Sequence, residues 1–267
     1  MSEFVAFARS HGLLIDYAPA DGRVHRCRTE AKPRRRNGAF MFDGQSGWVQ
    51  DWTIHPRAIG FRVPSDVEVR RIDRAALARD ERARRDQAQQ RAQQMIQRAE
   101  FDVHPYLARK GFPQHKGLVL GDKLLVPMRS FERYRELVYS VQTIDESGEK
   151  RFLVGGRTKG AVYRIGAGLE VWLVEGYATA LSVQAALQSL YRKAEVWVCF
   201  SAGNLEFVSR QIACRIFADN DVSGAGQKAA QASGRAWVMS PNVGEDANDM
   251  HQRTGVRAVA ELMRTVM

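Results

Sequence analysis

The 267-residue chain has few cysteines, no long apolar run and no Walker-type phosphate loop, and each absence excludes a class of protein. Its three cysteines, Cys27, Cys199 and Cys214, are too few and too scattered for a disulfide framework. No segment is long and apolar enough to span a bilayer, and the N-terminus lacks a signal-peptide pattern. Without a G-x-x-x-x-G-K-[ST] loop, these residues hold no P-loop helicase motor. We therefore expect a cytoplasmic protein with no membrane partner.

The charge balance and the apolar content indicate which classes of protein still fit the sequence. Forty lysines and arginines against thirty acidic residues give a formal charge of +10, which favours a polyanionic partner such as a nucleic acid. The hydrophobic content of 45% can fill a real core. The length suffices for one large domain or two small ones.

Changes of pattern divide the chain into four segments. Residues 1–65 carry a helical pattern and short strand candidates between Gly, Asn and Asp turns, which predicts a small antiparallel unit. Residues 66–100 are rich in Arg, Gln and Ala and predict a basic helical linker. Residues 101–168 mix a short helix with strands and a hairpin turned at Gly148. Residues 169–267 alternate strands and helices, which predicts an α/β domain with a parallel sheet flanked by helices.

Acidic residues stand at the ends of two predicted strands in the last segment. Glu175 follows the apolar run VWLV, and Asp219 and Asp221 follow the run RIFA. Because the chemistry of open parallel sheets gathers at the carboxyl ends of the strands, we expect these acids to lie together. Buried carboxylates need a compensating cation, and Mg²⁺ takes oxygen ligands alongside substrate phosphates. The pattern predicts phosphoryl-transfer or phosphodiester chemistry with one or two metal ions.

Three motifs in this order resemble the toprim domain of DNA primases, most closely that of plasmid- and phage-type primases. They read VWLVEGYATALS, IFADNDVSGAGQKAA and GEDANDMHQRTG, and the resemblance covers roughly residues 118–255. It implies a toprim-type parallel sheet within a primase-like catalytic core, preceded by the small N-terminal domain and the helical linker. It also implies Mg²⁺ or Mn²⁺ as cofactor and a location in the cytoplasm of a bacterial host.

The resemblance implies roles for individual acids. Glu175 takes the place of the family's glutamate, which acts as a general acid or base or helps to hold metal. The family's metal-binding positions correspond to Asp219, Asp221 and Asp246.

Two positions depart from the pattern of many bacterial primases. Thr179 stands where they carry a second acid, and Asn248 stands where they carry an aspartate in the third motif. Asp249, next to Asn248, is therefore a further candidate metal ligand, and the number of metals stays open. Tyr177 is interpreted as a packing residue at the start of a helix, and Asn204 as a helix cap rather than a residue that lines the site.

A basic segment bracketed by glycines, FLVGGRTKGAVYRIG, precedes the acidic motifs and extends the resemblance to primases. Arg157 and Lys159 are predicted to bind template, nucleoside triphosphate or nascent primer, because neighbouring glycines let the backbone approach a phosphate closely. The alternative is that both cations only solvate a tight turn.

The N-terminal unit stands where many primases carry a zinc ribbon. It offers Cys27 with His25, His11 and His55 but no paired ligand spacing, so we expect no zinc. Four aromatic residues are expected to supply packing in place of the metal, at least three of them in the core: Phe40, Phe42, Trp48 and Trp52. A basic loop is expected to bind single-stranded DNA through Arg34, Arg35 and Arg36.

Three functions are compatible with these features. The first is a DNA primase that binds single-stranded template and nucleoside triphosphates, joins nucleotides during phage or plasmid replication, and works with a separate replicative helicase. The second is a toprim-family metal-dependent nuclease, which uses the same acids with water as the nucleophile. The third is a non-catalytic DNA-binding accessory protein. The N-terminal unit and the basic segment favour the primase.

Overall fold

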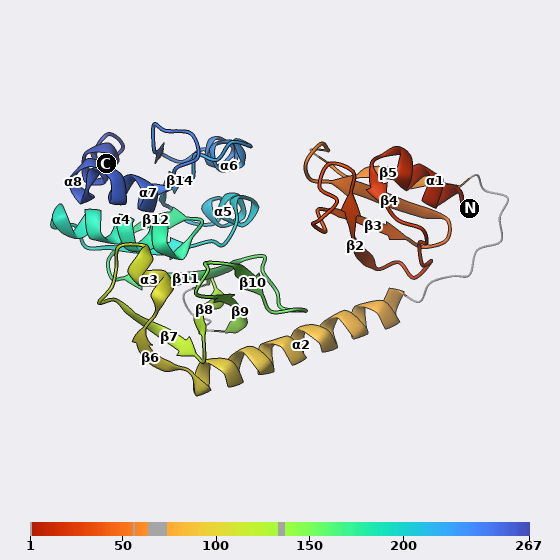
Figure 1. Cartoon of the computed structure of the whole chain (residues 1–267), viewed down its shortest axis with the longest axis horizontal. Coiled ribbons are helices and arrows are strands. Elements are labelled where there is room, and N and C mark those ends of the chain that lie inside the picture. The colour runs from red at the N-terminus through yellow and green to blue at the C-terminus, as the bar shows by residue number, and fades with distance from the viewer. Residues whose placement is uncertain (1, 56, 64–73, 133–136) are drawn as a thin grey trace. The chain divides into compact units, whose positions relative to one another are not determined.

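A computed structural model describes residues 2–55, 57–63, 74–132 and 137–267. Two compact units are present, Met1–Glu81 and Arg82–Met267. Within the predicted helical linker, 66–100, helix α2 runs over Arg74–Arg98, Glu100 already belongs to the next strand, and residues 66–73 lie outside the described residues (Figure 1). Among the described residues, no helix combines the length and apolar content needed to cross a bilayer.

Among its described residues up to Val63, the N-terminal unit forms a five-stranded antiparallel sheet with α1 (Glu3–Ser10) on one face. Neighbouring strands follow chain order: β1 (Leu13–Leu14), β2 (Val24–Thr29), β3 (Gly38–Phe42), β4 (Ser46–Asp51) and β5 (Ile59–Arg62). Phe4 of α1 stacks on Phe42 at 4.5 Å between ring centroids, and Phe40 and Val49 are buried beside it. The predicted small antiparallel domain is therefore present.

The C-terminal unit is built on a ten-stranded mixed sheet. Four strands at one side pair in parallel, in the spatial order β13 (Ala194–Val198), β12 (Glu170–Val174), β14 (Arg215–Ala218) and β15 (Trp237–Met239). The predicted parallel sheet is thus confirmed, and it continues without a break into antiparallel strands. These are β6 (Glu100–Val103), β7 (Lys116–Leu120), β8 (Lys123–Ser130), β9 (Val138–Ile144), β10 (Lys150–Phe152) and β11 (Ala161–Gly166).

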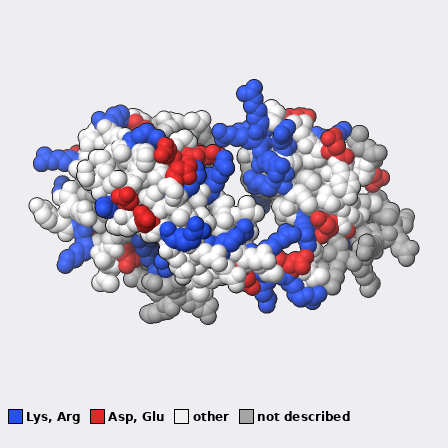
Figure 2. All heavy atoms as spheres, turned by 60° about the horizontal axis from the view of Figure 1, so that its bottom comes forward, with Lys and Arg blue, Asp and Glu red and all other residues white. Residues whose placement is uncertain are grey.

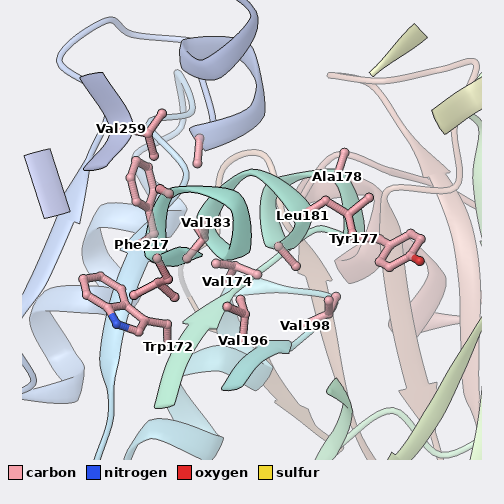
Figure 3. Packing of buried hydrophobic residues seen from close by; sticks show 14 of the residues in the cluster. Trp172, Val174, Tyr177, Ala178, Leu181, Val183, Val196, Val198, Phe217 and Val259 are labelled. Atoms are coloured by element: carbon pink, nitrogen blue, oxygen red, sulfur yellow. The ribbon is translucent and has the colours of Figure 1, made fainter. Parts of the chain in front are cut away.

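Helices cover both faces of the parallel part, as alternating side chains require. On one face, Trp172, Val174 and Phe217 pack against helix α4 (Tyr177–Ser189), and Figure 3 shows these side chains beneath the helix. The same core includes residues of α3 (Pro105–Arg109), α7 (Ala247–Thr254) and α8 (Val256–Arg264). On the other face, the intervening strand residues pack against α5 (Ala202–Ser209) and α6 (Ala225–Ser233). The sequences of these strands are continuous apolar runs, because both faces of each strand are buried.

Tyr177 confirms its predicted packing role. Its side chain is buried in the core at the start of α4 (Figure 3). Its hydroxyl lies 3.1 Å from His115 Nε2. The ring fills the junction between the parallel and antiparallel parts of the sheet, where it meets Tyr163 of β11.

Candidate active site

Glu175 follows β12 directly, at the carboxyl end of a central strand. Burial and the charge of Asp221 raise the pKa of its carboxyl to about 7, although a hydrogen bond from the Ala202 N–H and the charge of Lys150 oppose that rise. Its Oε1 atom is buried without a hydrogen-bond partner among the described residues. A carboxyl with a pKa near neutrality can accept or release a proton at physiological pH, which a general base requires.

Asp219 follows β14, the parallel neighbour of β12, so the two acids stand at the same edge of the sheet. Burial, followed by the charges of Glu175 and Asp246, raises the pKa of Asp219 to about 8. Its Oδ1 atom is also buried without a partner in the part of the chain that the structure describes. Two neighbouring carboxylates with unsatisfied buried oxygens are unfavourable unless a cation or a proton is shared between them.

Asp221 differs from these two acids because both of its carboxylate oxygens accept hydrogen bonds at the start of helix α6. The Gly226 N–H donates to Oδ2 at 3.1 Å, the Ala225 N–H to Oδ1 at 3.4 Å, and the Ser223 hydroxyl also donates to Oδ1. Burial alone would raise the pKa of Asp221, but these hydrogen bonds outweigh it and lower the pKa. Asp221 therefore stays ionised, and its negative charge is part of what raises the pKa of Glu175.

Asp246 is the N-cap of α7, and Thr179 fixes it from the facing helix. Asp246 Oδ1 accepts the N–H groups of Asn248 at 2.7 Å and Asp249 at 2.9 Å. Asp246 Oδ2 accepts the Thr179 hydroxyl at 3.0 Å. Many bacterial primases carry an acid at the position of Thr179. In this chain, the Thr179 hydroxyl instead donates a hydrogen bond that orients Asp246.

Asp249 and Asn248 are both engaged in contacts within the protein. Asp249 completes a capping box by accepting the Asp246 N–H at 3.3 Å, and it accepts from Lys110 Nζ at the same distance. Asn248 is buried and donates to the Lys110 carbonyl and the Ser182 hydroxyl. Residue 248 therefore ties α7 to α3 and α4, and the metal role of Asp249 remains a prediction.

The acids fit a divalent metal that is shared with a substrate. Within the described ranges, no three carboxylate, histidine or cysteine side chains are grouped so that the protein alone completes a metal site. Magnesium is usually bound by one or two carboxylates together with waters and substrate phosphates. The free oxygens of Glu175 and Asp219 are donors of this kind, and Asp221 and Asp246 add negative charge nearby.

The basic segment is anchored to the site by Asn204. Its side chain accepts the Gly160 N–H at 2.7 Å and donates to the carbonyls of Ala161 and Cys199. The predicted helix-cap role of Asn204 is wrong, because Ser201 is the cap of α5 and accepts the Asn204 N–H at 3.3 Å. Asn204 is the third residue of α5, and from there its side chain reaches the backbone of Gly160 and Ala161.

Arg157 and Lys159 are exposed, but each lies over an aromatic ring. The Arg157 guanidinium is 4.4 Å from the centre of the Tyr139 ring, and Lys159 Nζ is 4.7 Å from that of Phe207. No hydrogen bond or ion pair joins either cation to the acids within the described residues, so their role in binding remains a prediction. Ring contacts of this kind hold the two cations in place on the surface.

Lys150 is a site residue that reasoning from the sequence missed. It lies at the start of β10, after the hairpin turn, and its charge lowers the pKa of both Glu175 and Asp219. A β-carbon placed on Gly176 would lie 3.5 Å from Lys150 Nζ, so the ammonium group is next to the strand end. Lys150 reaches the strand end because the antiparallel hairpin folds onto the parallel sheet. No local sequence pattern indicates this contact.

In the N-terminal unit, the expectation for the aromatic residues is half wrong. Phe40 and Phe42 belong to the core, but Trp48 lies outside that cluster and the Trp52 side chain is 45% exposed. Because strand residues alternate, Trp48 lies opposite the buried Val49 face. The Arg26 guanidinium lies 4.1 Å from the centre of the Trp52 ring.

The basic loop and the cysteine of this unit differ in exposure. Arg34, Arg35 and Arg36 are all exposed in the loop between β2 and β3. Cys27 is buried against the core, and this burial raises its pKa to about 11. Figure 2 shows lysine and arginine side chains spread over the surface of both units.

Comparison with known proteins finds a family match for part of the C-terminal unit. Residues 170–257 match the family model of the toprim domain. The match contains Glu175, Asp219, Asp221 and Asp246, the four acids whose charges meet at the sheet edge. Residues 170–257 therefore resemble a toprim domain.

Curated relatives that match most of the chain are named as primases. Two Escherichia coli proteins, each named DNA primase TraC, are 26% identical to it over 84% of its length. The chain spans 23% of one relative and 17% of the other, so it corresponds to a fraction of either protein. A chain from a structure of the bacteriophage T7 lagging-strand DNA polymerase with primase domains is 14% identical, with a TM-score of 0.42 over 63% of this chain and 91% of that one. The protein resembles DNA primases that carry a toprim domain.

Proposed function

We propose that this protein is a DNA primase that synthesises short RNA primers on single-stranded DNA by Mg²⁺- or Mn²⁺-dependent nucleotidyl transfer. The observation that carries the proposal is the pair of buried acids, Glu175 and Asp219, each with an unsatisfied oxygen at the end of adjacent parallel strands. They lie in the region that matches the toprim family model, and the curated relatives are named as primases.

In this proposal, the residues of the protein have two tasks. They transfer a proton, and they hold charged groups in place around the reacting phosphate. In primer extension, a 3′-hydroxyl attacks the α-phosphorus of a nucleoside triphosphate, and pyrophosphate leaves with the electrons of the broken P–O bond. Glu175, with its pKa of about 7, would take the hydroxyl proton. Asp219 and Asp221 would hold the divalent metal with help from Asp246, and Asp249 is a further candidate. When bound, the metal supplies stabilisation of the charge that develops on the phosphate oxygens.

Nucleic-acid partners are proposed from the exposed cations. Arg34, Arg35 and Arg36 would meet the phosphates of single-stranded template, and Arg157 and Lys159 would bind template, primer or nucleotide. All five side chains are exposed, as such contacts require. We further propose that a separate replicative helicase works with this protein in phage or plasmid replication, and that the host cytoplasm is its location.

A toprim nuclease is the second candidate, since the same acids can activate water instead of a primer hydroxyl. Nucleotide-dependent synthesis is what separates the two, and a non-catalytic binding protein would show neither activity. The test is to incubate the protein with single-stranded DNA, labelled nucleoside triphosphates and Mg²⁺ or Mn²⁺. Labelled oligoribonucleotides support the primase, shortened DNA supports the nuclease, and binding without either product supports the accessory protein.

Matched variants connect the result to the site. Glu175→Gln and Asp219→Asn should each reduce primer synthesis by roughly 100-fold or more, because each removes a proton acceptor or a metal ligand. Glu261→Gln is the control, because Glu261 is an exposed carboxylate on α8. Primer synthesis that survives in both acid variants would overturn the proposed site.

A further inference from the structure

Helix α2 is strongly basic, and the proposed function gives it no role. Within the C-terminal unit, residues 82–98 of this helix hold five arginines and a single acidic residue, Asp86. All five arginines are exposed. A charged helix face often only keeps the helix soluble, so the contacts of α2 decide whether it can do more.

The C-terminal half of α2 is fixed on the antiparallel part of the sheet. Ala88 and Ala92 are fully buried, and their spacing of four residues places them on one face of the helix. Ala92 packs in a cluster with Leu125 of β8 and Val141 of β9. This half of the helix therefore belongs to the core of the C-terminal unit.

Two glycines let the basic segment pass between α2 and strand β9. A β-carbon on Gly155 would lie 3.3 Å from the carbonyl oxygen of Arg84 in α2. A β-carbon on Gly156 would lie 2.1 Å from the hydroxyl oxygen of Ser140 in β9. Gly155 also has a φ of +84°, which residues with a β-carbon disfavour. Larger residues at these two positions would push the segment, and Arg157 with it, away from the helix.

Arginines of α2 and of the segment meet at this contact. Arg91 Nη2 donates to the Val154 carbonyl at 3.0 Å. Arg84 is seven residues earlier, about two turns or 10 Å along the same face of the helix. Arg157 directly follows the glycine pair, and its guanidinium is 4.4 Å from the centre of the Tyr139 ring. Three guanidinium groups therefore border one short stretch of chain.

These three cations keep their charge unneutralised within the protein. Among the described residues, Arg84, Arg91 and Arg157 form no ion pair with a carboxylate. Asp86 is two residues from Arg84 and so lies on nearly the opposite side of the helix. A row of unpaired guanidinium groups attracts a polyanion, whose phosphates neutralise the cations in turn.

The basic segment also leads from α2 toward the acids. At its far end, the Gly160 N–H donates to Asn204 of α5 at 2.7 Å, and a backbone N–H of the same helix binds Glu175. Between the two helices, Arg157 and Lys159 are exposed. A strand whose end reacts at the acids can therefore lay its further phosphates along the segment and onto α2.

We propose that the face of α2 with Arg84 and Arg91 binds the phosphate backbone of single-stranded DNA at a distance from the acids. The proposal rests on the proposed primase function and extends its template path to an element that the sequence marks as a linker. Contacts to phosphates carry no base information, so this binding is independent of DNA sequence. The face holds the template, and no bond is made or broken there.

Fluorescence anisotropy of the whole chain with a labelled oligothymidylate of about 16 nucleotides tests the face. Arg84→Ala and Arg91→Ala should each weaken binding about fivefold and flatten the slope of log affinity against log salt by about 0.7. Arg84→Ala is the decisive variant, because Arg91 also holds the basic segment through its bond to Val154.

Arg82→Ala is the matched control for Arg84→Ala. Arg82 is an exposed arginine of the same helix, about 200° around the axis from Arg84, and its variant should bind like the wild type. Thermal unfolding verifies that each variant is folded, and Arg84→Lys should keep the salt slope of the wild type because it keeps the charge.

Failure of this face and failure of the proposed function give different results. If Arg84→Ala binds DNA with the same affinity and salt slope as Arg82→Ala, the face is overturned even in a protein that makes primers. If Arg84→Ala loses affinity in a protein that makes no primers, the face stands and the proposed function fails. In an active protein, Arg84→Ala should raise the KM for template about fivefold and leave the KM for nucleotides unchanged.

Discussion

The side-chain oxygen of Asn204 accepts the backbone N–H of Gly160 at 2.7 Å, and this bond joins helix α5 to the basic segment. The same helix begins at Ala202, whose N–H binds Glu175. One short helix therefore holds both the candidate general base and the loop of Arg157 and Lys159. The buried amide of Asn204 therefore links the position of that loop to the helix beside the acids.

Replacing Asn204 tests this dependence. Asn204→Leu keeps the volume but leaves the Gly160 N–H and two carbonyls unpaired, and a buried unpaired group costs about 1–3 kcal/mol. We expect a loss of stability of at least that size, measured by urea unfolding. Asn242→Ala removes one hydrogen bond of an exposed asparagine and should change stability by less than about 0.5 kcal/mol. Equal effects would show that the amide is not the anchor.

Gly226 fixes how closely α6 approaches the acids. A β-carbon at this position would lie 2.3 Å from the carbonyl oxygen of Asp219, so helix and strand end must separate if one is added. Gly226→Ala should destabilise the protein by roughly 1–3 kcal/mol and reduce activity, because Asp219 and Asp221 shift. Urea unfolding and the primer-synthesis assay measure the two effects.

Gly203 provides the matched control for this substitution. It also lies near the start of a helix, α5, but a β-carbon there would have no neighbour within 4 Å. Gly203→Ala should therefore be neutral or stabilise by about 0.5–1 kcal/mol, since alanine favours helix. Equal losses of stability in the two variants would contradict the proposed role of the close approach between Gly226 and Asp219.

Asp219 should make the metal-free protein less stable as the pH rises. Its pKa is about 8 in the folded protein, against a usual value of 3.8, so the folded state holds a proton that the unfolded state has released. Stability contributed by that proton is fully present below about pH 4 and is lost progressively as the pH rises toward 8.

The measurement is the Tm of the wild type and of Asp219→Asn at about pH 4.5, 6 and 8 in a chelator. The variant should be the more stable protein near pH 8, by several degrees, and the difference should shrink toward the acidic end of the range. Adding Mg²⁺ at the alkaline end should raise the Tm of the wild type more than that of the variant. A constant difference across this pH range would contradict the raised pKa.

The basic loop of the N-terminal unit is expected to bind DNA through phosphates alone. Changing Arg34, Arg35 and Arg36 together to Ala should weaken binding to all single-stranded sequences alike. The slope of log affinity against log salt should flatten by about 0.7 for each phosphate that the arginines no longer neutralise. Fluorescence anisotropy with labelled oligonucleotides measures both quantities. Arg257→Ala, an exposed arginine of α8, is the control, and an unchanged slope in the triple variant would exclude the loop as the binding site.

The aromatic residues of the N-terminal unit show where reasoning from the sequence reaches its limit. Phe40, Trp48 and Trp52 are all large and lie in or beside short strands, so composition alone assigns them to a core. Which side of the sheet each one faces depends on strand register and on which face α1 covers. Trp52 lies beyond the end of β4, where its ring is partly exposed, and it pairs with Arg26 instead.

The order of the three motifs carries the resemblance to a toprim domain, and the apolar runs before Glu175 and Asp219 predict buried strands whose ends meet at one edge. Glu175 and Asp219 were predicted on that basis, and the parallel pairing of β12 with β14 confirms that they lie together. The remaining residues of the site are brought together by contacts in the folded protein. Lys150, Thr179 and Asn204 come close to the acids or to the basic loop through contacts between distant elements, and local sequence patterns do not encode such contacts.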